Sequence, residues 1–238
     1  MQKRIVSWLK KEVKKTGAKG IILGLSGGID SAVVAALSKK AVTSGRVLAL
    51  LLPCLSQPQD LKDAKLVAKS LDIKTKKIDL SGLYGSLLKL LPPGNSLARA
   101  NLKPRLRMLT LYYFANNLNY LVCGTGNKSE LTVGYFTKYG DGGVDILPIG
   151  NLLKGQVRKL AEELGLPDRI ITKPPTAGLW QGQTDEGEMG ITYPELDAII
   201  LRLEKGLPQL SPRHKVRKVK QMYSRSSHKR QGPKICTV

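Results

Sequence analysis

The chain has 238 residues, of which 42% are hydrophobic, and this is enough for one packed domain with its own core. This apolar content excludes a wholly disordered chain, and no apolar run reaches the roughly 18 residues that a membrane helix needs. Lysines interrupt the first 15 residues, which therefore lack the apolar centre of a signal peptide, and we expect a cytoplasmic protein.

The formal net charge of +21 predicts partners that carry phosphate, such as nucleotides, nucleic acid or both. The excess is uneven, because residues 211–238 contain nine basic residues and no acidic one. On charge alone, a solvated tail or surface helix is the simpler interpretation of that segment. Cys54, Cys123 and Cys236 form no close pair, so we expect no disulfide scaffold, and the first two follow apolar runs typical of buried positions.

Hydrophobic periodicity predicts a series of alternating helices and strands. An amphipathic helix over 3–15 precedes a buried strand over 20–25, a glycine-rich turn, and a helix over 30–38. The elements expected next are a strand at 47–52, a helix at 59–70, a strand at 73–78, a helix at 105–118, a strand at 120–123, a short strand at 145–147, and helices at 154–164 and 193–204. The helix over 105–118 is apolar on most faces, which indicates burial in the core or between subunits.

This alternation predicts an α/β fold, in which a parallel β-sheet is flanked by helices on both faces with Rossmann-like layering. Ligands of such sheets bind beyond the carboxyl ends of the strands. Three polar segments follow predicted strands, namely 26–31, 52–56 and 124–130. We therefore expect these three segments to line one crevice.

The strongest local signal is Ser26-Gly27-Gly28-Ile29-Asp30-Ser31, between a predicted strand and a predicted helix. Glycines let the backbone approach a ligand, and N–H groups at a helix start favour an anion, so the segment predicts a phosphate loop. It matches neither the Walker pattern nor the dinucleotide fingerprint. Asp30 would repel phosphates unless a divalent cation lay between them, so we interpret it as a Mg²⁺ ligand. The alternative is an ordinary turn in which Asp30 caps the helix.

The segment 124–130 offers a second acid, Glu130, for the same cation, and its Thr125 is within reach of a nucleotide in the same crevice. The alternative interpretation is a helix start capped by Asn127 or Ser129. The two interpretations are compatible, because a capped helix can still present a carboxylate.

The loop over 26–31 resembles that of the adenylating enzymes, which include NAD synthetases, GMP synthetases, argininosuccinate synthetases and tRNA-modifying thiolases. The resemblance implies an adenine-nucleotide-hydrolase-like fold and cleavage of ATP to AMP and pyrophosphate. Further segments resemble those of NAD synthetases in particular, and they run in family order from residue 24 to residue 230: these are 101–108 (Asn-x-x-x-Arg-x-Arg-Met), 134–145, 173–177 and 227–230. The chain departs from the family at Ile29, where many members have Gln.

The resemblance implies one NAD synthetase domain over 1–238, a homodimer, and a basic segment over 211–238 that belongs to the substrate site. It also implies roles for individual residues. ATP would contact Gly24, Leu25, Ser26, Gly27, Gly28, Ile29, Asp30, Ser31, Thr125, Lys154 and Thr176, with Mg²⁺ on Asp30 and Glu130. Deamido-NAD would contact Arg105, Lys138, Asp145, His228 and Lys229. Asp141 and Glu188 would lie at the ammonia site as the catalytic residues.

The implied reaction converts deamido-NAD, ATP and ammonia into NAD, AMP and pyrophosphate through an acyl-adenylate. Asp141 is a candidate acceptor for the proton that ammonium must lose. The main alternative is a tRNA-modifying ATP pyrophosphatase with the same loop, favoured by the net charge and by Cys54. That alternative leaves residues 137–145 unexplained and lacks a second nearby cysteine to relay sulfur, so we expect no nucleic-acid partner.

Overall fold

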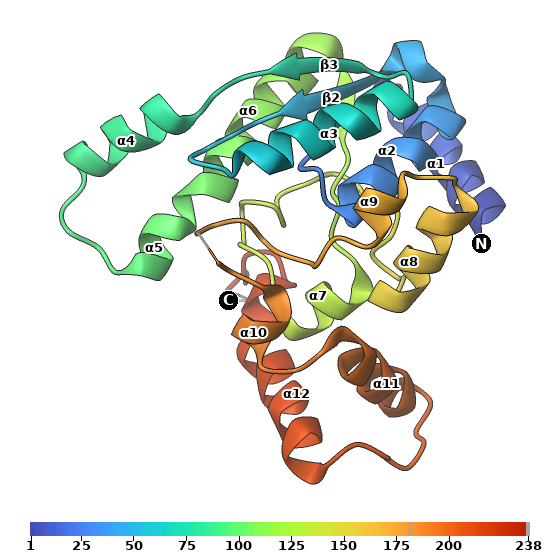
Figure 1. Cartoon of the computed structure of the whole chain (residues 1–238), viewed down its shortest axis with the longest axis vertical. Coiled ribbons are helices and arrows are strands. Elements are labelled where there is room, and N and C mark those ends of the chain that lie inside the picture. Colours follow the sequence, from blue (N-terminus) through green and yellow to red (C-terminus); the bar gives the residue numbers. More distant parts are fainter. Residues whose placement is uncertain (181, 237–238) are drawn as a thin grey trace.

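The computed structural model describes residues 1–180 and 182–236, and a four-stranded parallel sheet lies at its centre (Figure 1). The strand order is β3-β2-β1-β4, with bounds β1 Gly20–Gly24, β2 Val47–Leu51, β3 Lys74–Lys77 and β4 Tyr120–Val122. In the register, Ile21 of the central strand is opposite Val47 on one side and Leu121 on the other. The predicted α/β fold is confirmed.

Two helical layers cover the sheet, because side chains alternate between its faces along each strand. Ile21 and Leu23 of β1 join one core, whereas Ile22 between them joins the other. The first face is covered by α1 (Gln2–Thr16), α2 (Ile29–Val42), α3 (Pro58–Ser70), α8 (Lys154–Glu163) and α9 (Asp168–Ile171). The second face is covered by α4 (Ser81–Leu90) and α6 (Leu102–Leu118).

A third core lies outside the sheet and joins short helices near the C-terminal end. Its members include Val133, Met189, Leu196 and Val219. They belong to α7 (Lys128–Val133), α10 (Asp185–Met189), α11 (Tyr193–Glu204) and α12 (Arg213–Arg225). Figure 1 shows α11 and α12 projecting away from the sheet. The remaining elements are α5 (Ser96–Ala100), η1 (Ser44–Arg46) and η2 (Ser227–Lys229).

One element differs from the sequence-based expectations, and another is only partly covered within the single chain. The strand expected at 145–147 is only one parallel bridge between Cys123 and Ile146. The reason is that the Asp145 carboxylate accepts the N–H of Val122 at 2.8 Å, where a neighbouring strand would supply a carbonyl. The helix α6 covers the sheet with one face, while Leu109 and Tyr113 are 62% and 65% exposed, so of the two expected modes of burial the core accounts for one face alone and burial between subunits stays a prediction.

The cysteines and the edge strand have the exposure that their places in the fold give them. Cys54 and Cys123 are buried free thiols, as expected, and Cys236 is exposed. The edge strand β3 reads Lys-Thr-Lys-Lys and is exposed along its length, and such lysines discourage pairing with another chain. In the described part of the chain, no helix has both the length and the apolar character to cross a bilayer.

Candidate active site

A cavity of about 500 Å³ opens where β1, β2 and β4 end. All three polar segments that follow these strands contribute to its wall, as the parallel topology requires. Of the residues expected at the ATP site, those lining the cavity are Gly24, Leu25, Ser26, Gly28, Ile29, Asp30, Ser31, Thr125, Lys154 and Thr176; Gly27 does not line it.

Gly27 explains why the phosphate loop is built as it is. Its φ is +82°, and an added Cβ would lie 2.5 Å from the carbonyl oxygen of Asp60 and 2.9 Å from the nitrogen of Ala64. The loop therefore packs against α3 at a place where only glycine fits. Within the loop, the Ser31 hydroxyl donates to the carbonyl of Gly28 at 2.9 Å and accepts from the N–H of Ser26 at 3.3 Å. These contacts brace the loop at the start of α2, where free N–H groups favour an anion.

Asp30 and Glu130 come together around the ammonium group of Lys154. The Lys154 Nζ is 2.5 Å from Asp30 Oδ2 and 3.0 Å from Glu130 Oε1. The side-chain amide of Asn127 donates to the other oxygen of Asp30 at 3.0 Å. Asp30 is thus not the cap of α2, whose N-cap is Gly28. The capping interpretation of 127–130 is confirmed, because Asn127 and Glu130 form a capping box at the start of α7, and Glu130 still faces the cavity.

The electrostatics of this cluster depend on burial. Burial raises the pKa of Glu130 to about 7, an effect that Lys154 opposes and Asp30 reinforces. Burial also disfavours the charge on Lys154, but the attraction of Asp30 and Glu130 is stronger in sum and raises the pKa of its ammonium. Tyr193 completes the cluster from α11, with its hydroxyl 3.3 Å from Glu130 and 2.9 Å from Asp185.

The residues present fit a magnesium ion. Mg²⁺ is usually held by one or two carboxylates together with substrate phosphates, and here two carboxylates lie beside the predicted phosphate loop. In the structure each of the four carboxylate oxygens has a protein partner, supplied by Lys154, Asn127 or Tyr193. An ion bound here would replace part of the Lys154 contact.

Asp141 and Glu188 also reach the cavity wall. Asp141 accepts the N–H of Thr137 at 2.8 Å. Its side chain is open to the cavity but surrounded by protein, and this desolvation raises its pKa. The hydrogen bond from the Thr137 N–H and the positive charges of Lys229 and Arg107 act in the opposite direction, but their effect is smaller. Glu188 accepts from the Tyr135 hydroxyl and from the Gln183 amide, each at 2.7 Å.

The residues expected to bind deamido-NAD do not all share this cavity. Of the five, only Lys229 lines it. Arg105 donates to the carbonyl of Lys138 at 3.4 Å, and the Lys138 ammonium donates to the carbonyl of His228 at 2.6 Å. These three form an exposed group outside the cavity that joins α6 to η2. Asp145 lies apart from this group. It accepts a hydrogen bond at 2.9 Å from the hydroxyl of Tyr112, which is two helical turns beyond Arg105 in α6.

Lys229 connects the C-terminal segment to the cavity. Its ammonium donates to the carbonyls of Gly134 and Phe136, each at 2.8 Å, and so holds the backbone that leads to Thr137 and Asp141. Arg230, next in the chain, donates to the carbonyls of Leu131 and Thr132 at 3.2 and 3.0 Å. The basic segment therefore docks on α7 through several side chains.

Some residues that line the cavity, or that support its carboxylates, are not among the predicted site residues. Arg107 lines the wall and donates to the carbonyl of Leu52 at 3.1 Å and to Ser56 at 3.3 Å. Lys173 joins the segment after α9 to α3 through Asp60 and Asp63, each at 2.8 Å. Asn127 has a sequence signal, the Asn-x-x-Glu spacing of a capping box. The placement of Tyr193 has none, because it depends on how α11 packs.

Comparisons with known proteins agree with one another. A family model described as NAD synthase matches residues 1–233. The chain is 50% identical to the NH(3)-dependent NAD(+) synthetase of Carboxydothermus hydrogenoformans, over 98% of this chain and 95% of that protein. It is 51% identical to the protein of the same name from Archaeoglobus fulgidus, over 99% and 95%.

Solved structures of similar overall fold also belong to synthetases of this kind. An NMN synthetase from Francisella tularensis superposes with a TM-score of 0.92 at 39% identity, covering 100% of this chain and 97% of that one. An NH3-dependent NAD synthetase from Campylobacter jejuni superposes with a TM-score of 0.86 at 30% identity, covering 99% and 97%.

Proposed function

Because the chain belongs to the NAD synthase family, we propose that it is an ammonia-dependent NAD synthetase, which uses ATP to convert the carboxylate of deamido-NAD into an amide. One observation carries this proposal: the phosphate loop and the Asp141 segment line a single cavity. An enzyme that first adenylates a carboxylate and then aminates it needs both in one place. A tRNA-modifying activity is not favoured, because these relatives match over nearly their full length.

The first step is adenylation. A carboxylate oxygen of the substrate attacks the α-phosphorus of ATP, a new O–P bond forms, and pyrophosphate leaves with the electrons of the broken bond. The N–H groups at the start of α2 and the hydroxyls of Ser26 and Ser31 bind the phosphates. Asp30 and Glu130 would hold Mg²⁺, which would neutralise charge on the phosphates. Lys154 brings a further positive charge to the same place.

The second step is amide formation. The nitrogen of ammonia attacks the acyl carbon and a C–N bond forms; the C–O bond to AMP breaks with its electron pair on the AMP oxygen, and the nitrogen releases one proton to solvent. Most ammonia is ammonium at neutral pH, so a proton must be removed before the attack. Asp141 accepts it, because its raised pKa brings it closer to the working pH, and Glu188 adds negative charge that attracts ammonium.

The exposed group around Arg105 binds the dinucleotide outside the cavity. Arg105, Lys138 and His228 supply charges and donors for its phosphates, and Lys229 links them to the reacting end. Leu109 and Tyr113 lie on the same helix and are exposed. They support a homodimer in which α6 packs against a second subunit near the dinucleotide.

A second candidate substrate is the corresponding mononucleotide. The observation that favours it is the superposition on an NMN synthetase, a protein named for a mononucleotide product. A mononucleotide would occupy the reacting end and leave the outer group unused. Replacing Arg105 with Ala should therefore weaken a dinucleotide more than a mononucleotide.

The test is a direct assay. The protein is incubated with ATP, magnesium, ammonium and either deamido-NAD or nicotinate mononucleotide, and AMP and the amide product are measured together. We expect equal amounts of AMP and NAD, and no NAD when ammonium is left out. AMP without an amide product from either substrate would contradict the proposal.

A further inference from the structure

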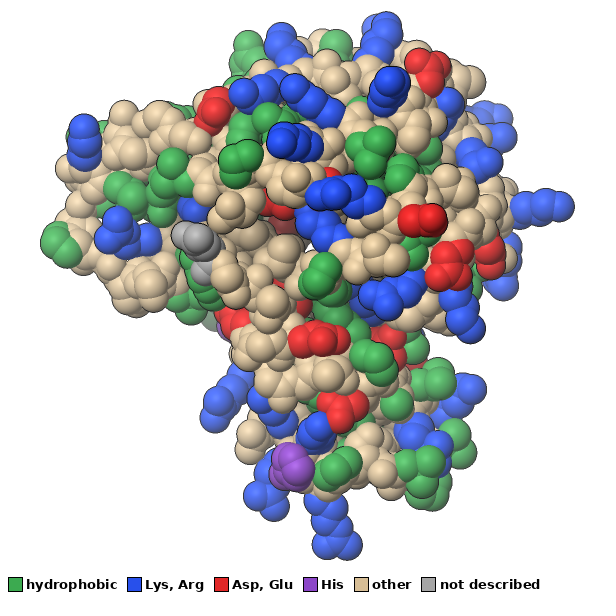
Figure 2. All heavy atoms as spheres, viewed as in Figure 1, with side chains coloured by type: hydrophobic (Ala, Val, Ile, Leu, Met, Phe, Trp, Pro, Cys, Tyr) green, Lys and Arg blue, Asp and Glu red, His purple; other side chains and the backbone are tan. Residues whose placement is uncertain are grey.

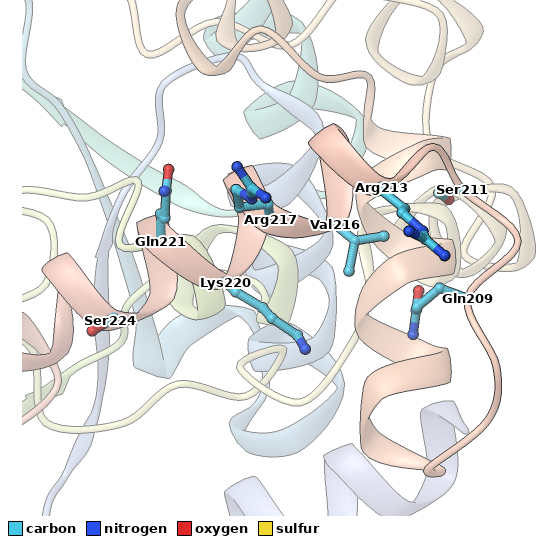
Figure 3. A pocket seen from close by; sticks show the side chains of 8 residues that line it. All are labelled: Gln209, Ser211, Arg213, Val216, Arg217, Lys220, Gln221 and Ser224. Atoms are coloured by element: carbon cyan, nitrogen blue, oxygen red, sulfur yellow. The ribbon is translucent and has the colours of Figure 1, made fainter.

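A second hollow in the molecule lies on α12, away from the active-site cavity, and shares no residue with it. It is an open groove between α12 and the loop that precedes this helix, with a volume of about 620 Å³ (Figure 3). We call it the α12 groove and define it by Gln209, Ser211, Arg213, Val216, Arg217 and Lys220. We propose that it binds an extended acidic peptide segment of a partner protein.

The charge of the groove is uncompensated. Among the described residues, none makes a hydrogen bond or ion pair with the side chains of Arg213, Arg217 and Lys220. Other lysines of α12 are bound: Lys215 pairs with Glu195, and Lys218 donates to the carbonyl of Gly190. No acidic residue occurs after Glu204, so neither α12 nor the loop before it contains a counter-charge of its own.

This arrangement is unfavourable for the isolated helix. Arg213 stands at the first position of α12, where the helix dipole disfavours a cation, and the first turn holds no acid. Like charges three and four residues apart, as in Arg213, Arg217 and Lys220, also repel each other. An anionic partner would remove both effects, so the groove has the charge of a surface that binds one.

Gln209 decides what kind of anion fits. Both its amide nitrogen and its amide oxygen are buried and, among the described residues, have no hydrogen-bond partner. Because Gln209 lines the groove, a rotation of its side chain would turn the amide toward a bound segment, and a peptide group, which offers one donor and one acceptor, would satisfy both atoms. A phosphate chain offers acceptors alone and would leave the Gln209 oxygen without a partner. The lining contains no aromatic side chain on which the bases of a single-stranded nucleic acid could stack.

The spacing of the charges also suits a strand. Arg213 and Arg217 lie about 6 Å apart along the helix axis, at about 1.5 Å per residue. Side chains two apart in an extended peptide point the same way and are separated by about 6.6 Å. Alternate acidic residues would thus meet successive cations, and Val216 with the aliphatic stems of the arginines would contact the residues between.

The test uses fluorescence anisotropy with a fluorescein-labelled decapeptide of alternating Glu and Thr. Replacing Arg213, Arg217 and Lys220 together by Ala should weaken its binding about tenfold, as expected for three exposed ion pairs. The matched control replaces Lys10, Lys11 and Lys14, exposed lysines of α1, and removes the same charge elsewhere. This control should change the affinity less than about twofold. Circular dichroism melting checks that all variants fold.

Gln209→Ala separates a peptide from other anions. It should weaken the decapeptide about threefold, the effect of one lost hydrogen-bond pair, and leave the affinity for inorganic tripolyphosphate unchanged. Equal losses in the two triple variants would overturn the proposal, because binding would then follow net charge alone. No binding of the decapeptide would overturn it as well, and so would a groove-dependent affinity for tripolyphosphate or oligo-dT greater than that for the peptide.

Discussion

Gly134 joins the active site to the C-terminal segment, and its replacement by alanine should loosen both. The residue ends α7 with a φ of +71°, and an added Cβ would overlap Cβ of Ser226 and lie 2.5 Å from its hydroxyl oxygen. Two costs follow. The left-handed backbone disfavours alanine by about 1 kcal/mol, and the overlap with a buried side chain adds about 1–3 kcal/mol. We therefore expect Gly134→Ala to lower the free energy of unfolding by about 2–4 kcal/mol.

The same change should reach the substrate. The carbonyl of Gly134 accepts from Lys229, and Ser226 immediately precedes η2, which carries His228. Displacing Ser226 moves η2, so the Michaelis constant for deamido-NAD should rise while that for ATP stays nearly constant. Urea unfolding followed by circular dichroism at a fixed protein concentration gives the stability, and steady-state kinetics gives the two constants.

Two further variants isolate the cause. Gly17→Ala places alanine at an almost identical φ of +70° with nothing within 4 Å, so it should show the backbone cost alone, about 1 kcal/mol. Ser226→Gly removes the atoms that the new Cβ would meet, so adding it to Gly134→Ala should restore part of the lost stability. The reasoning is refuted if Gly134→Ala destabilises no more than Gly17→Ala, or if the double variant recovers nothing.

Four other perturbations test the site and its supports. Asp30→Asn should keep the fold and abolish AMP formation, and near-normal turnover at saturating magnesium would remove Asp30 from the mechanism. Asp141→Asn should slow amide formation more than adenylation and recover partly at raised pH, where free ammonia is more abundant; a pH profile parallel to the parent's would count against a proton acceptor. Deleting residues 225–238 should raise the Michaelis constant for deamido-NAD at least about tenfold, because one or two charge-assisted hydrogen bonds are lost. The Michaelis constant for ATP should rise far less, and equal effects on both constants would make the segment merely structural. Asp63→Asn should destabilise the fold by about 2 kcal/mol at neutral pH, because it removes charge-assisted hydrogen bonds.

The pH dependence of the Asp63 variant has a defined sign. Burial acts to raise the pKa of Asp63, but hydrogen bonds from Lys173, Arg169 and Gln59 hold it below its usual value. A depressed carboxyl pKa stabilises the fold above the unfolded value of about 3.9, and this stabilisation is lost as pH falls through the folded value. The stability difference between the parent and Asp63→Asn should therefore shrink as pH falls below about 4, and vanish below the folded pKa of Asp63. A difference that does not shrink at all between neutral pH and about pH 3 would show that the contribution of Asp63 is not electrostatic.

The sequence predicts the fold well where the signal is local. The buried strands and the glycine-rich turn give the parallel sheet and place residues 26–31 at a strand end, and Asp30 does reach the cavity. The short helices are harder, because periodicity needs a window longer than the six residues of α7. In α12 only Val216 and Val219 are buried, and basic residues occupy most other positions, so an apolar periodicity is hard to recognise in its sequence.

The details of the site depend on contacts that no local pattern contains. Lys154 reaches Asp30 across 124 positions of sequence, and only a family resemblance points to it. His228 and Lys229 are neighbours in one short turn, yet Lys229 lines the cavity and His228 does not. The wall position of Arg107 follows from how α6 lies over the end of β2, which side-chain periodicity does not specify.

The distance between Asp30 and Lys154 along the chain also orders events during synthesis. The ribosome releases the phosphate loop early, but β4, the second neighbour of the central strand, follows about one hundred residues later. The cation that neutralises Asp30 and Glu130 comes later still, in α8. A nascent chain that ends before residue 154 therefore holds two carboxylates with no ammonium between them and an unfinished helical layer over β1. Long-range contacts of this kind form slowly, so the unfinished chain is the form most exposed to proteases and chaperones.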